Sequence, residues 1–178
     1  MSNPHTHPAS SIRDGETVLA TDPAALPGDG HVVFIGRIRT PWATRKDCPK
    51  NPREARERGQ PATVLVDDVY RPGLSGLAGH SHVIVLYWMN EARRDLIVQH
   101  PAHATQPRGV FSLRSPVRPN PIALSVVKLV SVNMKTGHIE IDAIDCVDGT
   151  PLLDIKPYLP SVDAIPSAVV PSPVPSQP

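Results

Sequence analysis

Cysteine and long apolar runs are both scarce in this sequence. Cys48 and Cys146 are the two cysteines, and they lie too far apart to form a CxxC pair. No run approaches the 18 apolar residues of a membrane span, and no apolar segment opens the chain. We therefore expect a soluble, cytoplasmic protein with reduced thiols and no membrane partner.

The common catalytic loop motifs are also missing. The sequence contains no Walker loop, no GxSxG elbow and no HExxH motif. Gly73, Gly76 and Gly79 have GxxGxxG spacing, but they precede a strand-like segment instead of following one. A dinucleotide fingerprint requires the order strand, glycine loop, helix, so a tight loop is the better interpretation.

Proline is the residue in excess, with 22 among 178 residues. This density excludes long-helix bundles, coiled coils and repeat solenoids, and it favours short strands and fixed turns. The length fits one ordinary domain plus tails. We expect a flexible arm over residues 1–30, a globular domain over 31–160 and a Pro-rich tail over 161–178.

Hydrophobic patterning inside the globular part is mostly that of strands. Helix signals are confined to residues 51–59, where Asn51 would cap the helix, Pro52 would open it and Gly59 would end it, and to a weaker candidate at 91–98. The clearest hairpin joins two alternating segments through Lys135-Thr136-Gly137. The expected strands are 31–40, 63–70, 82–89 (buried on both faces), 110–114, 121–134, 138–146 and 152–155. The fold class is therefore all-β: a small antiparallel β-barrel with loop and short-helix decorations.

Charge is unevenly distributed along the chain. Residues 37–58 contain eight basic and three acidic side chains, and residues 93–118 contain five arginines and one aspartate. Residues 139–163 contain six acidic side chains and one lysine. The basic segments could attract an anionic partner, or they could be a solvated charged face.

Eight histidines raise the hypothesis of a metal site. His80 and His82 are two residues apart at a strand start, and His100 and His103 lie in a Pro-containing segment. None has a recognised ligand spacing with cysteine or carboxylates, so structural or exposed histidines are favoured and no metal is expected. A metal-dependent hydrolase remains a distant alternative.

Two segments carry the densest candidate chemistry. In residues 114–121, three prolines hold Arg114 and Arg118 at set positions, which suits carboxylate or phosphate oxygens or, equally, a barrel corner. Farther along, Asp154, Lys156 and Tyr158 alternate in an extended segment, so all three could point to one side. They could handle a proton, or they could form a buried hydrogen-bonded network.

These two segments resemble the signatures of the TsaA-like (YaeB, TrmO) family. The first is Gly109-Val110-Phe111-Ser112-Leu113-Arg114-Ser115-Pro116-Val117-Arg118-Pro119-Asn120-Pro121-Ile122-Ala123-Leu124-Ser125, and the second is Asp148-Gly149-Thr150-Pro151 followed by Asp154-Ile155-Lys156-Pro157-Tyr158. Weaker matches are Ile35-Gly36 with Thr40-Pro41-Trp42, and Ser81-His82. The motifs occur in the family's order and span about residues 32–163.

The resemblance implies an S-adenosylmethionine-binding β-barrel that works as a homodimer. The implied reaction is methylation of N6 of threonylcarbamoyladenosine, beside the anticodon in tRNA. The donor contacts carried over from the family are Lys50, Asn51, Pro52, Met89, Asn90, Arg114, Leu124, Asp142, Ala143, Ile144, Asp145, Gly149 and Thr150. Met89 and Leu124 could line an adenine pocket, Arg114 could hold the donor's carboxylate, and Asp145 could accept from hydroxyl or amino groups.

The remaining roles follow as hypotheses from the same resemblance. Asp154 or Tyr158 would accept or relay the proton that leaves the methylated nitrogen, and Lys156 would tune that pair. Arg39, Arg45 and Arg118 would contact RNA phosphates. The chain has a Pro-rich tail where long bacterial members have a further C-terminal domain, so a different RNA or small-molecule substrate stays open. A non-catalytic donor- or RNA-binding module is the alternative from another class.

Overall fold

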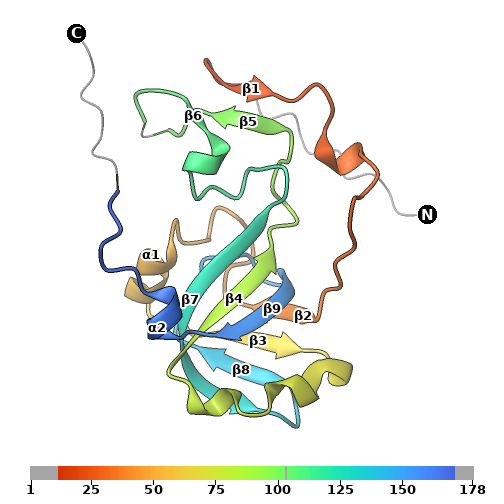
Figure 1. Ribbon diagram of the computed structural model, residues 1–178, viewed down its shortest axis with the longest axis vertical. Coiled ribbons are helices and arrows are strands. Elements are labelled where there is room, and N and C mark those ends of the chain that lie inside the picture. Colours follow the sequence, from red (N-terminus) through yellow and green to blue (C-terminus); the bar gives the residue numbers. More distant parts are fainter. Residues whose placement is uncertain (1–11, 103, 171–178) are drawn as a thin grey trace. The chain divides into compact units, whose positions relative to one another are not determined.

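Six antiparallel strands from residues 30–90 and 122–169 close into a barrel (Figure 1). The computed structural model describes residues 12–102 and 104–170. Around the barrel the strand order is β2-β3-β8-β7-β4-β9, and because the sheet closes on itself it has no free edge. The strands are β2 (Gly36–Arg39), β3 (Ala62–Val66), β4 (His82–Trp88), β7 (Ile122–Asn133), β8 (His138–Ile141) and β9 (Pro151–Pro157). The predicted all-β barrel is confirmed.

Strand β4 shows how the barrel interior is filled. Its side chains alternate, so Val83, Val85 and Tyr87 are buried while their neighbours on the outer face are only partly covered. The prediction that this segment is buried on both faces was therefore wrong. A six-stranded barrel is narrow, and valine and isoleucine dominate its core.

Strand β7 presents four apolar side chains on its outer face. The register with β4 places Val127 opposite Val83 and Ser125 opposite Val85, and the buried residues of β7 are Ser125, Val127 and Leu129. Ile122, Leu124, Val126 and Val130 form an outer apolar stripe and are 36–54% exposed. Alternation along a strand predicts two faces, but it does not tell which of them is the core.

The β7–β8 hairpin is confirmed, with Gly137 in its turn at φ 72°. Strand β8 ends at Ile141, although the sequence pattern predicted a strand as far as Cys146. The Asp142 N–H still donates to the Lys128 carbonyl at 3.1 Å, and beyond this point the chain leaves the sheet.

The start of the barrel domain differs from the sequence prediction. The apolar residues Val32, Val33 and Phe34 are not part of a strand, and they are 61%, 65% and 42% exposed. Strand β2 meets β9 only through the pairs Gly36–Leu152 and Arg37–Pro151. Strand β9 then continues along β4, so it offers no ladder partner to the residues before Ile35.

Between β3 and β4 the chain forms two 3-10 helices, η2 (Asp68–Leu74) and η3 (Leu77–Gly79). The predicted strand over 63–70 therefore ends early, at Val66. The predicted tight glycine loop is confirmed, with Gly76 at φ 81° between the two 3-10 helices. Leu74 is 5% exposed and belongs to the barrel core.

Of the described residues, 12–29, 91–102 and 104–121 belong to a second, smaller unit. It holds a three-stranded sheet of β1 (Thr17–Val18), β5 (Leu96–Gln99) and β6 (Arg108–Gly109), with the 3-10 helices η1 (Pro23–Ala25) and η4 (Val110–Ser112). The weaker helix candidate at 91–98 was wrong, because its β-branched end pairs with β1 and β6. The predicted strand at 110–114 was also wrong, since the Leu113 N–H closes a 3-10 turn onto the Val110 carbonyl. The predicted domain boundaries stay a prediction.

Two short α-helices accompany the barrel. Helix α1 (Pro52–Glu57) confirms the local prediction, and α2 (Pro160–Asp163) follows β9. Within residues 12–102 and 104–170, no helix has the length and apolar character needed to cross a bilayer.

Candidate functional site

Two connections of the barrel are joined by hydrogen bonds at one place. They are the β2–β3 connection (residues 40–61) and the β8–β9 connection (residues 142–150). Thr40 donates from its hydroxyl to the Cys146 carbonyl at 3.0 Å and from its backbone N–H to Asp148 Oδ1 at 3.0 Å. The Trp42 indole donates to the Ile144 carbonyl at 3.1 Å, and the Trp42 carbonyl accepts from the Asp148 N–H at 2.8 Å. Most of the residues predicted to contact S-adenosylmethionine lie on these two connections.

The start of helix α1 fixes the conformation of the Lys50-Asn51-Pro52 turn. Asn51 has extended backbone angles, and its side-chain oxygen accepts from the Glu54 N–H at 2.9 Å, as an N-cap does. The Glu54 carboxylate reaches back and accepts from the Lys50 N–H at 3.0 Å. The backbone of the predicted turn is therefore held from both sides of the helix start.

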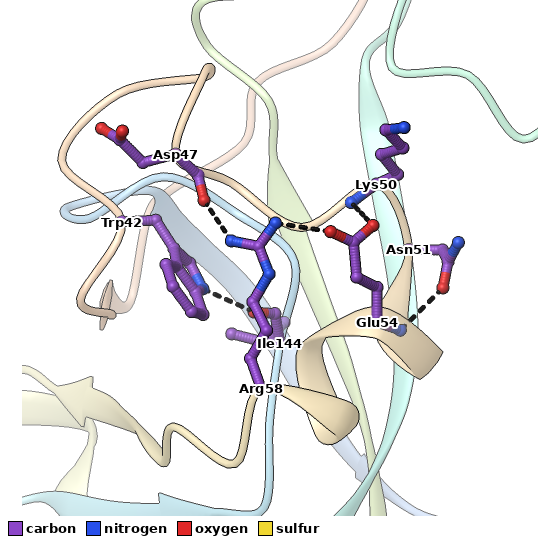
Figure 2. A network of polar contacts seen from close by, with 7 residues as sticks. All are labelled: Trp42, Asp47, Lys50, Asn51, Glu54, Arg58 and Ile144. Atoms are coloured by element: carbon purple, nitrogen blue, oxygen red, sulfur yellow. Dashed lines mark hydrogen bonds and ion pairs between the residues drawn. The ribbon is translucent and has the colours of Figure 1, made fainter.

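Arg58 connects the end of α1 to the rest of this connection (Figure 2). Its Nη1 donates to the Asp47 carbonyl at 2.6 Å, and its Nη2 pairs with Glu54 Oε1 at 2.5 Å. Its guanidinium carbon lies 5.1 Å from the centre of the Trp42 ring, in cation–π geometry.

Arg56 joins the same helix to the β8–β9 connection. Its Nε pairs with Asp142 Oδ2 at 2.7 Å, and its Nη2 donates to the Val126 carbonyl at 3.0 Å. The other oxygen of Asp142 accepts from the Lys128 N–H at 2.9 Å. Both oxygens of Asp142 are thus engaged within the chain, so its observed contacts anchor the connection.

Asp145 is the half-buried carboxylate between these elements and β4. Ser125, Tyr87 and Asp145 form a chain of contacts, with 3.0 Å between the two hydroxyl oxygens and 3.4 Å from the Tyr87 hydroxyl to Asp145 Oδ1. Burial raises the pKa of Tyr87, and the Asp145 charge adds to the rise. Burial and then Asp145 also raise the pKa of Cys48 to about 11. A half-buried carboxylate in this position can accept hydrogen bonds from hydroxyl or amino groups of a ligand.

The other barrel residues predicted to contact S-adenosylmethionine differ in their exposure to solvent. Leu124 is 42% exposed on the outer face of β7, and Met89 packs partly against the core at the end of β4. Ala143 and Ile144 are 0% and 1% exposed, so neither residue offers surface to a ligand in this conformation. Asn90 is exposed directly after Met89.

Gly149 and Thr150 form the turn that leads into β9. Gly149 has a φ of 80° and donates from its N–H to the Ile38 carbonyl at 2.8 Å. Thr150 is buried, and its hydroxyl donates to the Val147 carbonyl at 2.7 Å. The contacts of both residues stabilise the turn.

The structure brings two of the three predicted proton-handling residues together. Lys156 Nζ and Asp154 Oδ2 are 2.7 Å apart on the outer face of β9, opposite residues of β4 whose side chains also face outward. Tyr158 instead packs edge-on against His82, with ring centres 6.5 Å apart, at the first residue of β4. Tyr87 lies five residues farther along that strand, or about 16 Å at the usual rise.

The arginines predicted to contact RNA have different environments. Arg39 pairs with Asp148 at 3.2 Å, and Arg45 is exposed in the β2–β3 connection. Arg118, in the smaller unit, donates to the carbonyls of Val110, Leu113 and Ser115 at 3.2, 2.5 and 3.0 Å. Arg114 is exposed in the same unit.

The histidines within the described part of the chain do not assemble a metal centre. Among the residues that the structure describes, no group of three or more His, Cys, Asp or Glu side chains could hold a metal ion. His82 contacts the Ser81 hydroxyl, and His100 contacts the backbone oxygens of Asp14 and Ala104. His103 lies outside the described residues.

Sequence reasoning missed several residues that shape this site. Glu54 and Arg58 have the i,i+4 spacing of a helical ion pair, a signal that could have identified them. Tyr87 and Ser125 gave no such signal, because their contact depends on the register between β4 and β7. Trp42 was noted only within a weak motif, although it is 8% exposed and joins the two connections.

Comparison with known proteins identifies relatives over most of the barrel. Residues 37–164 match the family described as tRNA-methyltransferase O N-terminal domain. The VirR protein of Rhizobium radiobacter is 44% identical over 135 residues, which are 75% of this chain and 74% of the relative. An S-adenosyl-L-methionine-binding protein of Archaeoglobus fulgidus is 38% identical over 131 residues, 74% of this chain and 91% of the relative.

Enzymes named as methyltransferases are similar but longer. The tRNA (adenine(37)-N6)-methyltransferase of Escherichia coli K12 is 31% identical over 140 residues, which are 75% of this chain and 60% of that enzyme. The crystal structure of TrmO from Pseudomonas aeruginosa aligns with a TM-score of 0.62 and 31% identity over 80% of this chain and 62% of that one. The chain therefore spans less than two thirds of these two proteins.

Proposed function

Because the chain belongs to the family of tRNA-methyltransferase O N-terminal domains, we propose that it is an S-adenosylmethionine-dependent methyltransferase. The observation that carries the proposal is the joining of the Lys50–Pro52 turn to residues Asp142–Asp145. Motifs some 90 residues apart in the sequence are connected by the Trp42–Ile144 hydrogen bond and the Arg56–Asp142 ion pair. This is how a ligand site built from several loops is assembled.

The chemistry of these residues fits the proposed donor. The half-buried Asp145 carboxylate can accept hydrogen bonds from ribose hydroxyls or an amino group, and exposed Leu124 offers an apolar surface for the adenine. Arg114 is exposed, and a guanidinium can pair with a carboxylate such as that of the donor. When bound, the donor supplies a methyl group on a positively charged sulfur, open to in-line attack by a nucleophile.

We infer that the substrate is tRNA, methylated at N6 of threonylcarbamoyladenosine beside the anticodon. In the basic segment of residues 37–58, the structure pairs Arg39, Arg53, Arg56 and Arg58 with carboxylates. Within the described part of the chain, the remaining cations Arg37, Arg45, Lys46 and Lys50 have no ion pair. These four, Arg45 foremost, are suited to RNA phosphates. Arg39 and Arg118 would also contact RNA phosphates, in addition to the contacts that they make within the chain.

The Asp154–Lys156 pair is the proposed proton acceptor. As the nitrogen–methyl bond forms, the nitrogen must lose a proton, and Asp154 is a carboxylate that can take it while Lys156 stabilises its charge. Tyr158 lies beside the first residue of β4, far from Tyr87 and Asp145. We therefore propose that Tyr158 relays the proton only if the bound RNA reaches along β4 as far as His82. We propose further that two copies of the chain form the working homodimer.

A second candidate function is a donor-binding module without catalysis. It is favoured by the Archaeoglobus fulgidus relative, of which the match covers 91% and which is named only as a binding protein. The same site would then bind the donor without a reaction, and turnover on tRNA separates the two candidates.

Calorimetric titration of the full chain with S-adenosylmethionine tests the proposal. Saturable binding is expected, with a loss of affinity in Arg114→Ala and in Asp145→Asn, which keeps the shape and removes the charge. Asp67→Asn, at an exposed carboxylate outside both connections, is the matched control and should bind like the wild type. Absence of binding at millimolar donor refutes the proposal. A methyl-transfer assay then tests the substrate and separates the enzyme from the donor-binding module. Transfer is expected to tRNA that bears threonylcarbamoyladenosine and not to tRNA that lacks it.

A further inference from the structure

The Glu54 carboxylate has two partners on opposite ends of helix α1. Oε2 accepts from the Lys50 N–H at 3.0 Å, ahead of the helix, and Oε1 pairs with Arg58 Nη2 at 2.5 Å, behind it. The Lys50 N–H, followed by Arg58, lowers the pKa of Glu54, so the carboxylate is ionised throughout the neutral range. One side chain thus links the proposed donor turn to a guanidinium.

Arg58 carries the connection onward to the β8–β9 connection (Figure 2). It donates to the Asp47 carbonyl at 2.6 Å and lies over the Trp42 ring, whose indole donates to the Ile144 carbonyl. Residues from Lys50 to Ile144 therefore form one continuous set of contacts. In the close-up view the Lys50 ammonium points away from this set, so it stays available to a ligand.

Helix α1 also contains a pair of the same chemistry that lacks these additional contacts. Arg53 Nε pairs with Glu57 Oε1 at 2.9 Å with the same i,i+4 spacing, and the two side chains are 88% and 61% exposed. Among the described residues neither has a further polar partner. Exposed pairs of this kind contribute little to stability. The helix therefore supplies its own internal control.

We propose that Glu54 and Arg58 are positioning residues that hold the Lys50-Asn51-Pro52 turn in its donor-binding conformation. This inference rests on the proposed function and assigns the pair no contact with the donor itself. Without Arg58, Glu54 keeps only the Lys50 N–H, and Trp42 loses the cation above its ring. The turn would then sample other conformations, and the donor would have to order it on binding.

The role needs the planar guanidinium and not only a positive charge. Two donors of Arg58 reach different acceptors while its face covers Trp42. A lysine ammonium is a point charge and cannot make this combination of contacts. Arg58→Lys is therefore expected to fall between the wild type and Arg58→Ala.

The test combines donor titration with amide hydrogen exchange on the full chain. In calorimetry with S-adenosylmethionine, Arg58→Ala and Glu54→Gln should weaken binding by about tenfold, the factor typical of one charge-assisted hydrogen bond. Arg53→Ala should stay within about twofold of the wild type, as for an exposed pair. Without donor, exchange of the Lys50 amide should be faster in Arg58→Ala and unchanged in Arg53→Ala. Urea midpoints identify variants that are globally unfolded, and Glu54→Gln keeps the test decisive if Arg58→Ala does not fold.

The two readouts separate this inference from the proposed function. If the wild type binds the donor and Arg58→Ala and Glu54→Gln bind equally well, the positioning role is overturned. If Arg53→Ala weakens binding as much as Arg58→Ala, helix stability explains the effect and the role is again overturned. If the wild type shows no binding while Lys50 exchange still depends on Arg58, the proposed function fails and the ordering of the turn stands.

Discussion

Replacing Tyr87 with phenylalanine removes one hydroxyl from the centre of the site and leaves the shape of the side chain. Tyr87 is 3% exposed and Ser125 is 2% exposed, so water cannot readily replace the contact between them. The Ser125 hydroxyl donates to the Tyr87 oxygen when the Tyr87 hydroxyl donates to Asp145. In Tyr87→Phe, a buried Ser125 hydroxyl loses this partner and Asp145 loses a donor.

The expected cost follows from the burial of Ser125. A buried hydroxyl left without a partner costs about 1–3 kcal/mol in the free energy of unfolding. Ser125→Ala should cost less, because Tyr87 can still donate to Asp145. The double variant removes both partners, so it should be less destabilised than the two single variants added together, by about 0.5–1.5 kcal/mol.

Urea unfolding at pH 7, followed by tryptophan fluorescence, measures all four proteins of this cycle. The slope of the free energy of unfolding against urea concentration should be the same in each, because the surface exposed on unfolding hardly changes. Additive single effects, or a cost of Tyr87→Phe below about 0.5 kcal/mol, would refute the assignment of a buried hydrogen bond to this pair.

Alkaline pH gives a second readout for Tyr87. Burial, assisted by Asp145, raises its pKa above the ordinary 10.0, so the folded chain keeps a proton that the unfolded chain releases above about pH 10. The free energy of unfolding of the wild type should therefore fall as the pH rises above 10. Tyr87→Phe lacks this contribution, so the stability difference between the two proteins should shrink between pH 10 and 11.

Two further predictions concern glycine and cysteine. Gly137→Ala should destabilise the β7–β8 hairpin by more than about 2 kcal/mol, because its φ is 72° and a Cβ would lie 2.2 Å from the Val66 carbonyl oxygen. Gly59→Ala should cost only about 1 kcal/mol, because Gly59 has a φ of 64° but a Cβ there would meet nothing within 4 Å beyond its chain neighbours. Equal urea midpoints for the two variants would contradict the role of the close contact at Gly137. At pH 8.5, iodoacetamide should alkylate Cys48 about a hundredfold more slowly in the native chain than in urea, since burial followed by the Asp145 charge raises its pKa from 9.0 to about 11. Mass spectrometry of the Cys48 peptide measures both rates, and equal rates would place the thiol in solvent.

Several features could be predicted from the sequence because their signals are local. Helix α1 was predicted from Asn51, Pro52 and Gly59, and each of these acts within a few residues of its own position. The β7–β8 turn at Gly137 is of the same kind. The motifs around Arg114 and Asp148 led to the family, because a family is defined by residue order along the chain.

The contacts that build the candidate site could not be predicted in this way. Alternation along β7 was visible, but whether Leu124 or Ser125 faces the core depends on the pairing with β4. The exposure of Val32 to Phe34 depends on where β9 leaves β2, which is a property of the closed barrel.

The fold class, the family and a set of candidate residues follow from the sequence alone. The joining of the two connections by Trp42 and Arg56, and the engagement of Asp142 as an anchor, depend on the tertiary structure. The physical reason is that hydrogen bonds and ion pairs require specific distances between atoms. Those distances are set by strand register and barrel closure, which no short stretch of sequence encodes.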